Sequence, residues 1–424
     1  MRRILKKIMF VVCIPMLILT GCSKDDTAKI IPANANMVVS LDMMKIALEG
    51  DLLNSPLFDE ASRMLQINPL DMGIDFTEPL YLFQMGEGVF GLTATIGDAG
   101  DLEECLNNYA KENIAKKTTE KDGLTWSRIL GEVNLAYNAN TILLLTDIGG
   151  SSSNAKRAMK EMFELKEEDS FFATEDFKKM QENASSDISV YVNLACVPED
   201  IRSPYRFLLP DDAKFSDVKA TATLDAEDGL FVATTNVYSD VPQVQAAIDS
   251  SLVSLQKLSG SLISQIPQNA SLVLMAGVHG KELFQFIKKN TTLSEYLILA
   301  AIGTSTDVPE LIANAEGDVM ICVGENGLDV WTNGLKTSIT KGEPCDEVKK
   351  LKWSKGEITD YCLFGVVDFT VIDNTQLSKE IPLPSIYDLV NDIECMTIAS
   401  KGKGDLTLKL YSLNDENIFK QLLH

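Results

Sequence analysis

Short runs in which hydrophobic and polar residues alternate recur along the chain and predict β-strands. The run "DISVYVNL" (187–194) changes character at every second residue, which is the period of a strand with one buried face. The stretch 217–240 contains two such runs around Glu227-Asp228-Gly229, and this pattern predicts a hairpin. A further pair of apolar runs surrounds the glycine-rich segment Gly86–Gly91 and predicts a second hairpin.

Other segments carry the longer period of an amphipathic helix. The stretch 101–117 has Asp101 in the position of an N-cap, and the stretch 151–166 begins with serine and asparagine residues that can cap a helix. The apolar face of the first helix is formed by Leu102, Cys105, Leu106 and Tyr109. Because the strands connect locally and the helices lie between groups of strands, we predict an α+β fold of mostly antiparallel sheets packed with helices.

The order of predicted elements restarts near Ile266. The segment "IPQNASLVLMAG" that begins there resembles "IPANANMVVSLD", which begins at Ile31, although Asp42 of the first segment is matched by Gly277. A repeat this long corresponds to a whole domain rather than to a solenoid unit, so we predict two related domains from a degenerate duplication. The predicted boundaries are 30–262 for the first domain, with an insertion near 100–165, and 263–424 for the second, shorter domain.

The N-terminal segment indicates where the protein is sent in the cell, and we do not expect it to form part of the fold. A basic start is followed by an apolar run from Ile8 to Leu19, long enough for a signal peptide and too short to span a membrane. Leu19-Thr20-Gly21-Cys22 looks like the lipobox of bacterial lipoproteins, in which the cysteine receives the lipid. We therefore predict a signal peptide over 1–21 and lipidation of Cys22, with an ordinary secretory signal as the alternative.

The residues 22–29 form an acidic tether in this prediction. The letters "SKDD" after Cys22 resemble the export signal of surface-exposed lipoproteins in Bacteroidota, and a solvated linker is the alternative. Asp26-Thr27-Ala28 resembles the O-glycosylation site of that phylum, which makes Thr27 a candidate acceptor. We expect attachment to the outer membrane and exposure at the cell surface, although the tether itself leaves open which face of that membrane carries the protein.

Together with the lipobox, the "IP-x-x-A" start and the "VV-x-LD" strand resemble a family of Bacteroidota outer-membrane lipoproteins catalogued as a domain of unknown function. The resemblance implies an α+β body with a partly degenerate second copy. The family has no established activity, so the resemblance implies a location and a fold but no function.

The amino-acid composition disfavours several classes of partner and of catalytic site. The formal net charge of −23 disfavours nucleic acids and anionic lipid heads as partners, because like charges repel. The chain has 2 histidines, His279 and His424, which leaves little room for zinc sites or for nucleophiles that depend on an imidazole. We predict no cofactor, no metal site and no nucleic-acid partner, and we expect membrane contact through the N-terminal lipid.

Several motifs with chemical meaning have simpler structural explanations. Gly86–Gly91 fits G-x-G-x-x-G, but strand-like residues follow where a dinucleotide site needs a helix. Asp225–Gly229 resembles a calcium loop without its distal glutamate, and His279 lies at a predicted strand-to-helix junction where capping is the commoner role. Serine and lysine stand three residues apart, without the companion motifs of penicillin-binding enzymes, at Ser153–Lys156, Ser216–Lys219, Ser254–Lys257 and Ser338–Lys341.

The remaining candidates are acids, cysteines and tryptophans. Acidic residues are adjacent at Asp211-Asp212 and Glu167–Asp169, but a glycosidase needs two carboxylates that meet across a cleft, and a solvated acidic face explains these runs more simply. The cysteines after Cys22 show no C-x-x-C spacing, so we predict free, packed thiols, with Cys345 and Cys362 as the pair to test for a disulfide. Core packing is the favoured role of the tryptophans over a glycan platform: Trp126, Trp331 and Trp353.

No catalytic group of residues stands out in this sequence. We therefore predict that the protein is not an enzyme but a lipid-anchored envelope protein that binds or assembles something. Two alternatives remain: a surface glycan-binding protein, and a hydrolase whose site holds two carboxylates that face each other across a cleft.

Overall fold

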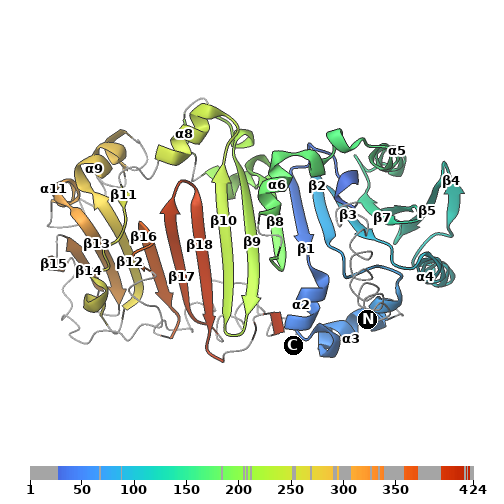
Figure 1. Ribbon diagram of the computed structural model, residues 1–424, viewed down its shortest axis with the longest axis horizontal. Coiled ribbons are helices and arrows are strands. Elements are labelled where there is room, and N and C mark those ends of the chain that lie inside the picture. The colour runs from blue at the N-terminus through green and yellow to red at the C-terminus, as the bar shows by residue number, and fades with distance from the viewer. Residues whose placement is uncertain are drawn as a thin grey trace, which may run out of the picture. The chain divides into compact units, whose positions relative to one another are not determined.

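The computed structural model divides the chain into two compact units (Figure 1). Unit 1 takes Met1–Ala35 and Ile67–Phe177, and unit 2 takes Asn36–Gln66 and Lys178–His424. The residues that the structure describes are 27–65, 68–86, 88–182, 185–203, 206, 209–210, 213–250, 255–267, 270–289, 294–295, 307–324, 327–332, 335–338, 358–370, 393–414, 417 and 419–420.

Unit 1 is built on an antiparallel sheet with the strand order β2-β3-β7-β6-β5-β4. Its strands are β2 (Leu80–Met85), β3 (Val89–Thr95), β4 (Thr119–Lys121), β5 (Leu124–Ile129), β6 (Val133–Tyr137) and β7 (Thr141–Thr146). Its helices are η1 (Ala28–Ile30), η3 (Pro69–Asp71), α4 (Ala99–Lys111), α5 (Ser152–Phe163), η4 (Glu167–Asp169) and η5 (Phe171–Ala173), and α6 (Glu175–Gln181) contains the boundary to unit 2.

Helix α4 closes the core of unit 1. Its predicted apolar face is confirmed, because Leu102, Cys105, Leu106 and Tyr109 are all buried. The predicted N-cap is wrong: the carboxylate of Asp98, and not of Asp101, accepts from the backbone N–H of Gly100 at 2.7 Å. The helix also ends at Lys111 rather than at 117, since the following residues pair with β5 instead. The core beneath it contains Ala94, Ile96, Leu135, Tyr137 and Ile142.

Unit 2 contains a longer antiparallel sheet with the strand order β1-β8-β9-β10-β18-β17-β16-β12-β13-β14-β15. Its strands are β1 (Met37–Leu41), β8 (Ile188–Asn193), β9 (Lys219–Glu227), β10 (Leu230–Tyr238), β12 (Ala270–His279), β13 (Glu316–Gly324), β14 (Gly327–Thr332), β15 (Leu335–Ser338), β16 (Leu363–Asp368), β17 (Ile393–Gly402) and β18 (Asp405–Ser412). The short strand β11 (Leu255–Gln256) pairs with the end of β12.

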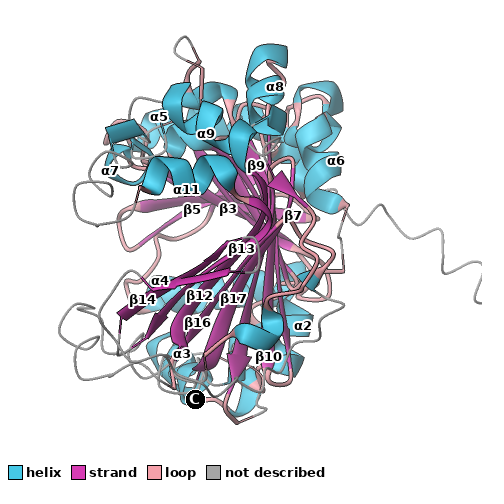
Figure 2. Ribbon diagram, turned by 90° about the vertical axis from the view of Figure 1, so that its left-hand side faces the viewer, coloured by secondary structure: helices cyan, strands magenta, loops and turns pink. Residues whose placement is uncertain are grey.

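The helices of unit 2 lie toward the two ends of these strands. Helices α8, α9 and α11 gather at one end, and α2 and α3 lie at the other (Figures 1 and 2). The helices are α2 (Met43–Glu49), η2 (Leu52–Asn54), α3 (Pro56–Leu65), η6 (Leu194–Cys196), α7 (Glu199–Arg202), η8 (Phe215–Asp217), α8 (Pro242–Ser250), η9 (Ile263–Gln265), α9 (Gly280–Lys289) and α11 (Val308–Asn314). The predicted α+β class with antiparallel sheets is therefore confirmed.

Two halves of the unit 2 sheet have the same strand order. One half reads β1-β8-β9-β10 and the other reads β12-β16-β17-β18. Strands β10 and β18 join the halves, pairing from Leu230↔Tyr411 to Asn236↔Asp405. The expected boundary at 262/263 thus falls inside one continuous sheet, because backbone hydrogen bonds cross it. The expected insertion near 100–165 lies within unit 1.

The strand-to-helix junctions of the two halves differ at the position where the sequences differ. Strand β1 ends at Leu41, and the side chain of Asp42 caps α2 by accepting from the backbone N–H of Lys45 at 2.9 Å. Strand β12 continues to His279, and a Cβ on Gly277 would lie 2.2 Å from the carbonyl oxygen of Gln256. The exchange of Asp42 for Gly277 therefore reflects helix capping in one half and close backbone packing in the other.

A buried cluster covers one face of the second half of the unit 2 sheet. Leu258, Leu262 and Ile266 pack there over strand residues. The strand residues of this cluster include Val273, Met275, Met320, Cys322, Trp331, Phe364, Val366, Cys395 and Ala399. Among the described residues, no helix is both long and apolar enough to cross a membrane.

Candidate functional site

The glycine motif of unit 1 is a hairpin turn, as the sequence predicts. Gly86 and Gly88 lie between β2 and β3 with positive φ angles of 54° and 74°. Gly91 lies in β3, where a Cβ would approach the Phe83 ring to 2.1 Å. Because a strand follows the motif, no helix N-terminus is available to face a pyrophosphate.

Several sequence candidates lie outside the described residues. These are Cys22, Asp211-Asp212, Ser254, Lys341, Cys345 and Trp353. Thr27 is described and is 1% exposed. A transferase could not reach its hydroxyl in this arrangement, so glycosylation of Thr27 stays a prediction and would have to precede folding.

The described cysteines and histidine have structural surroundings. Cys105, Cys322, Cys362 and Cys395 are buried, while Cys196 is half-buried, and Cys105, Cys196 and Cys362 are free thiols. His279 is half-buried, and its Nδ1 lies 2.8 Å from a carboxylate oxygen of Glu316 on the neighbouring strand. Trp331 is 3% exposed within the unit 2 core, which confirms the core role that we favour.

Three acids in unit 2 gather around one lysine. The ammonium of Lys45 lies 2.6 Å from the carboxylate of Asp187, which is 0% exposed, 3.7 Å from Asp225 and 3.9 Å from Glu49. The second carboxylate oxygen of Asp187 accepts from the backbone N–H of Ala226 at 2.6 Å. These acids share one cation inside the unit, whereas the hydrolase alternative needs two acids on opposite sides of a cleft.

This lysine-centred cluster shifts the pKa values of Glu49 and Lys45. Burial raises the pKa of Glu49 to about 7, with a further contribution from the negative charge of Asp187. Burial opposes the charge on Lys45, but the hydrogen bond and charge of Asp187 outweigh that cost, and the pKa of Lys45 is raised. A buried carboxylate with its own cation is the usual arrangement of a structural ion pair. Asp225, which the sequence placed in a segment resembling a calcium loop, lies within β9 and belongs to this cluster.

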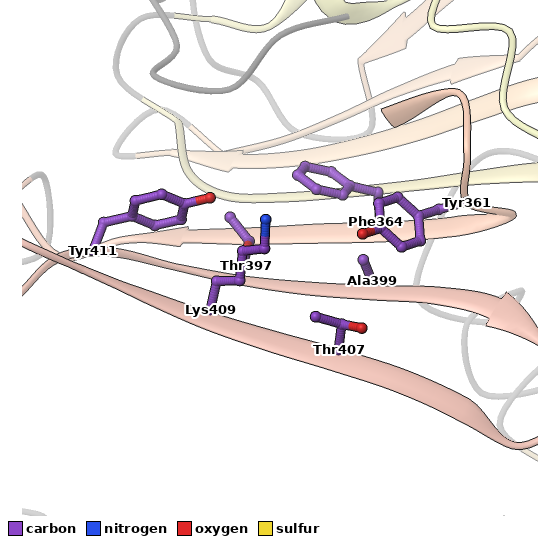
Figure 3. A pocket seen from close by; sticks show the side chains of 7 residues that line it. All are labelled: Tyr361, Phe364, Thr397, Ala399, Thr407, Lys409 and Tyr411. Carbon is purple, nitrogen blue, oxygen red and sulfur yellow. The ribbon is translucent and has the colours of Figure 1, made fainter. Parts of the chain in front are cut away.

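A shallow depression lies on the unit 2 sheet beside the aromatic residues Tyr361, Phe364 and Tyr411. Figure 3 shows Lys409 and Thr397 between the Tyr411 ring on one side and the Tyr361 and Phe364 rings on the other. Its volume of about 10 Å³ is room for one water molecule at most. The depression is too small to hold an organic ligand.

A larger cavity lies in unit 1, and we name it the basic pocket. Its volume is about 320 Å³. The residues that line it are Lys116, Lys117, Thr119, Trp126, Ser127, Arg128, Ser152 and Lys156. Half of these side chains are cationic and none is acidic, in a chain whose net charge is −23. The basic pocket is therefore a local reversal of the overall charge.

Strand β5 and the segment before β4 form one side of the basic pocket. The backbone N–H of Lys116 donates to the carbonyl of Arg128 at 2.8 Å, and the Ser127 hydroxyl donates to the carbonyl of Lys116 at 2.6 Å. These two bonds hold the lysine-bearing segment against β5. The indole N–H of Trp126 donates to the carbonyl of Lys121 at 3.2 Å, which fixes its ring in the pocket wall.

Helix α5 supplies the other side. Ser152 and Lys156 stand four residues apart, so they share one face of the helix near its start. The hydroxyl of Ser151 caps the helix by accepting from the backbone N–H of Asn154. The ammonium of Lys156 lies 5.9 Å from the centroid of the Trp126 ring. This contact joins the two sides of the pocket across its aromatic wall.

One of the four cations is already neutralised. Arg128 forms two hydrogen bonds to the Asp147 carboxylate, at 3.1 and 2.8 Å. Asn134, which is 0% exposed, accepts from Arg128 and donates to Asp147 at 2.8 Å. The hydrogen bonds from Arg128 and then from Asn134 lower the pKa of Asp147. Lys116, Lys117 and Lys156 are exposed and form no ion pair with a described carboxylate, so their charges remain for a ligand.

Sequence reasoning missed this pocket. Ser153–Lys156 drew attention only as one of four serine and lysine pairs, and the structure places Lys156 with the lysines of 116–117 instead of in a nucleophile site. Among the other pairs, Lys219 forms an ion pair with Asp240. The one signal in the sequence was Trp126, which we considered for a glycan platform. Its side chain is packed, with 8% of the residue exposed, and it also lines the pocket.

Comparison with known proteins identifies the family. The chain belongs to the family defined by the domain of unknown function DUF4836, whose profile matches residues 59–337. No curated protein matches the chain in sequence.

Among solved structures, the chain is similar to crystal form IV of TP0453, with a TM-score of 0.33 and 10% identity over 53% of this chain and 85% of that chain. Crystal form III of TP0453 gives a TM-score of 0.32 and 10% identity over 55% and 88%. Similarity at this level carries no conclusion about function.

Proposed function

We propose that this protein is a lipid-anchored, non-catalytic binding protein of the outer membrane, with the basic pocket of unit 1 as its binding site. The observation that carries the proposal is the gathering of Lys116, Lys117 and Lys156 around an open cavity with no acidic lining. Charges placed this way attract a ligand of opposite sign and supply no general base or nucleophile pair. The lipobox that ends at Cys22 supports the proposed membrane location.

The proposal also includes an origin by duplication in a Bacteroidota lipoprotein. The shared strand order of β1-β8-β9-β10 and β12-β16-β17-β18 supports the duplication, as does the similarity of the segments that begin at Ile31 and Ile266. The "SKDD" letters after Cys22 support exposure at the cell surface.

The substitution Cys22→Ala tests the proposed lipid anchor. We expect it to abolish labelling with radioactive palmitate and to release the protein from the membrane fraction, because the acyl chains on Cys22 are the proposed anchor. A Cys196→Ala variant, which removes a thiol within the fold, is the matched control. Unchanged labelling or membrane retention of the Cys22→Ala variant would contradict the proposed anchor. Protease added to intact cells should degrade the wild-type body if it faces outward.

The glycan-binding alternative has one specific observation in its favour. Trp126 and three hydroxyl-bearing residues line the basic pocket, and aromatic rings with nearby hydroxyls are common at sugar sites. Affinity electrophoresis in gels that contain neutral polysaccharides tests this alternative. Retardation by a neutral polysaccharide that is lost in Trp126→Ala would favour it, and unchanged mobility would remove it.

A further inference from the structure

We infer that the basic pocket binds a phosphomonoester group, and that the headgroups of the membrane that carries the anchor are its source. This inference deepens the proposed function, because it rests on the same pocket and on lipidation of Cys22. Three features point to this ligand: the charge of the pocket, the volume of the pocket and the short tether between unit 1 and the lipid anchor.

The charge of the pocket calls for a dianion. Three lysines line the cavity without a described carboxylate partner, while Arg128 is matched by Asp147 at 2.8 Å. A carboxylate carries one negative charge, whereas a phosphomonoester carries about −1.5 to −2 at neutral pH and offers three acceptor oxygens. Lysine binds such a group as a point charge, and three lysines around one cavity can contact it from different sides.

The size of the pocket calls for more than a bare ion. A volume of about 320 Å³ lies at the lower end of the range of roughly 300–1,000 Å³ that ligand sites occupy. The Trp126 ring and Thr119 extend the lining beyond the lysines. A phosphate that carries an organic group would therefore contact both the cations and this wall.

The tether places unit 1 close to the membrane. Thr27 and Ala28 are 1% and 0% exposed, and they belong to the same compact unit as the pocket. The carbonyl of Ile31 accepts from the backbone N–H of Phe171 at 2.7 Å, which fixes the start of the described chain in this unit. Four residues lie between Cys22 and Thr27, and the five steps from one Cα to the other span at most about 18 Å in a fully extended chain.

The net charge of −23 does not prevent this local attraction. At physiological ionic strength, interactions between exposed charges fade over roughly 8 Å. A phosphate inside the pocket is therefore governed by Lys116, Lys117 and Lys156 rather than by distant acids. The same net charge should repel the protein from a membrane that carries negative charge but no suitable headgroup.

The test uses the mature chain with Cys22→Ala, which keeps every described residue and removes the anchor. Titration calorimetry with inorganic phosphate should show saturable binding. Lys117→Ser/Lys156→Ser should weaken it by about tenfold or more, since hydrogen bonds to charged groups contribute strongly. The control Lys111→Ser/Lys166→Ser removes the same charge from exposed positions outside the pocket and should leave the affinity within about twofold. Absent saturable binding, or equal weakening in both variants, would overturn the inference.

Vesicles distinguish the sources of the phosphate. Phosphatidylcholine vesicles with one fifth phosphatidic acid, which has a phosphomonoester headgroup, should sediment the protein, and vesicles with one fifth phosphatidylglycerol should not. Binding of inorganic phosphate without sedimentation would support the pocket and assign it to a free phosphorylated solute. Equal sedimentation with both anionic lipids would overturn recognition of the phosphomonoester. The intact mass of the wild-type chain reports lipidation separately, so a failed anchor and a failed pocket give different results.

Discussion

Lys45 of unit 2 and the lysines of the basic pocket in unit 1 have opposite surroundings. Lys45 of unit 2 lies 2.6 Å from the fully buried carboxylate of Asp187, with Glu49 and Asp225 within 4 Å. Lys117 and Lys156 of unit 1 line an open cavity with no acidic residue in its wall. The same side chain therefore completes a structural ion pair in one unit and presents unmatched charge in the other.

This difference teaches that the partners of a charge, rather than its residue type, indicate its role. A cation that neutralises a buried acid stabilises the fold, because its removal leaves that acid without compensation. Exposed cations held close to one another contribute little to stability and repel each other, so their arrangement is better explained by a ligand. Substitutions in the two places should consequently affect different measurements.

The largest expected effect is on the stability of unit 2. Lys45→Met should lower the free energy of unfolding by about 3 kcal/mol, because Asp187 would stay buried without a cation. Denaturant titration measures this loss. The control Lys160→Met breaks an exposed ion pair with Asp122 and should cost less than about 1 kcal/mol. A loss for Lys45→Met no larger than that of the control would contradict a structural role.

The next effect is a pH dependence centred on Glu49. Its pKa is raised from 4.5 to about 7, so between these values the folded state holds a proton that the unfolded state has lost. Stability from this group is fully present below pH 4.5 and is lost as the pH rises through 7, by about 2 kcal/mol. Glu49→Gln should remove this part of the slope in denaturant titrations at several pH values. Parallel slopes in wild type and variant would refute the shift.

A smaller effect should follow from removal of the buried amide behind the basic pocket. Asn134→Ala should destabilise unit 1 by about 1–2 kcal/mol, because Arg128 and Asp147 lose a shared partner. Thermal unfolding monitored by tryptophan fluorescence, to which Trp126 of unit 1 contributes, would report the change. Asn108→Ala, at an exposed position on α4, is the control and should change stability by less than about 0.5 kcal/mol.

The smallest effect on stability should come from the pocket lysines themselves. Lys117→Ser/Lys156→Ser should change the free energy of unfolding by less than about 0.5 kcal/mol, since both side chains are exposed and lack ion-pair partners among the described residues. Denaturant titration of the double variant provides the comparison with Lys45→Met. A loss near 3 kcal/mol would place these lysines among the structural residues and remove the contrast between the units.

Local patterns predicted much of the fold. The alternation in 217–240 became the β9–β10 hairpin, and the apolar face of α4 became buried. The pairing of β10 with β18 joins residues 171 positions apart at Thr235 and Leu406, and no local pattern encodes it. For this reason the sequence divides the chain at 262/263, whereas the structure closes one sheet across that boundary.

The basic pocket could not be predicted in the same way. Its lysines come from the segment before β4 and from α5, and exposed polar positions carry no hydrophobic period. The Lys45 cluster was equally hidden, because Asp187 and Asp225 look like ordinary surface acids until β8, β9 and α2 bring them together. The lipobox and the export signal near Cys22 are short runs of consecutive residues, so they can be predicted from the sequence without knowledge of the fold.

The most direct measurement of the central claim is the position of a bound phosphate analogue. Crystals of the mature chain soaked in tungstate, collected where no neighbouring molecule covers the basic pocket, should show an anomalous peak between Lys116, Lys117 and Lys156. Crystals of Lys117→Ser/Lys156→Ser should lack that peak. A pocket without anomalous density in the wild-type crystals, or a peak that persists in the double variant, would contradict a phosphate site.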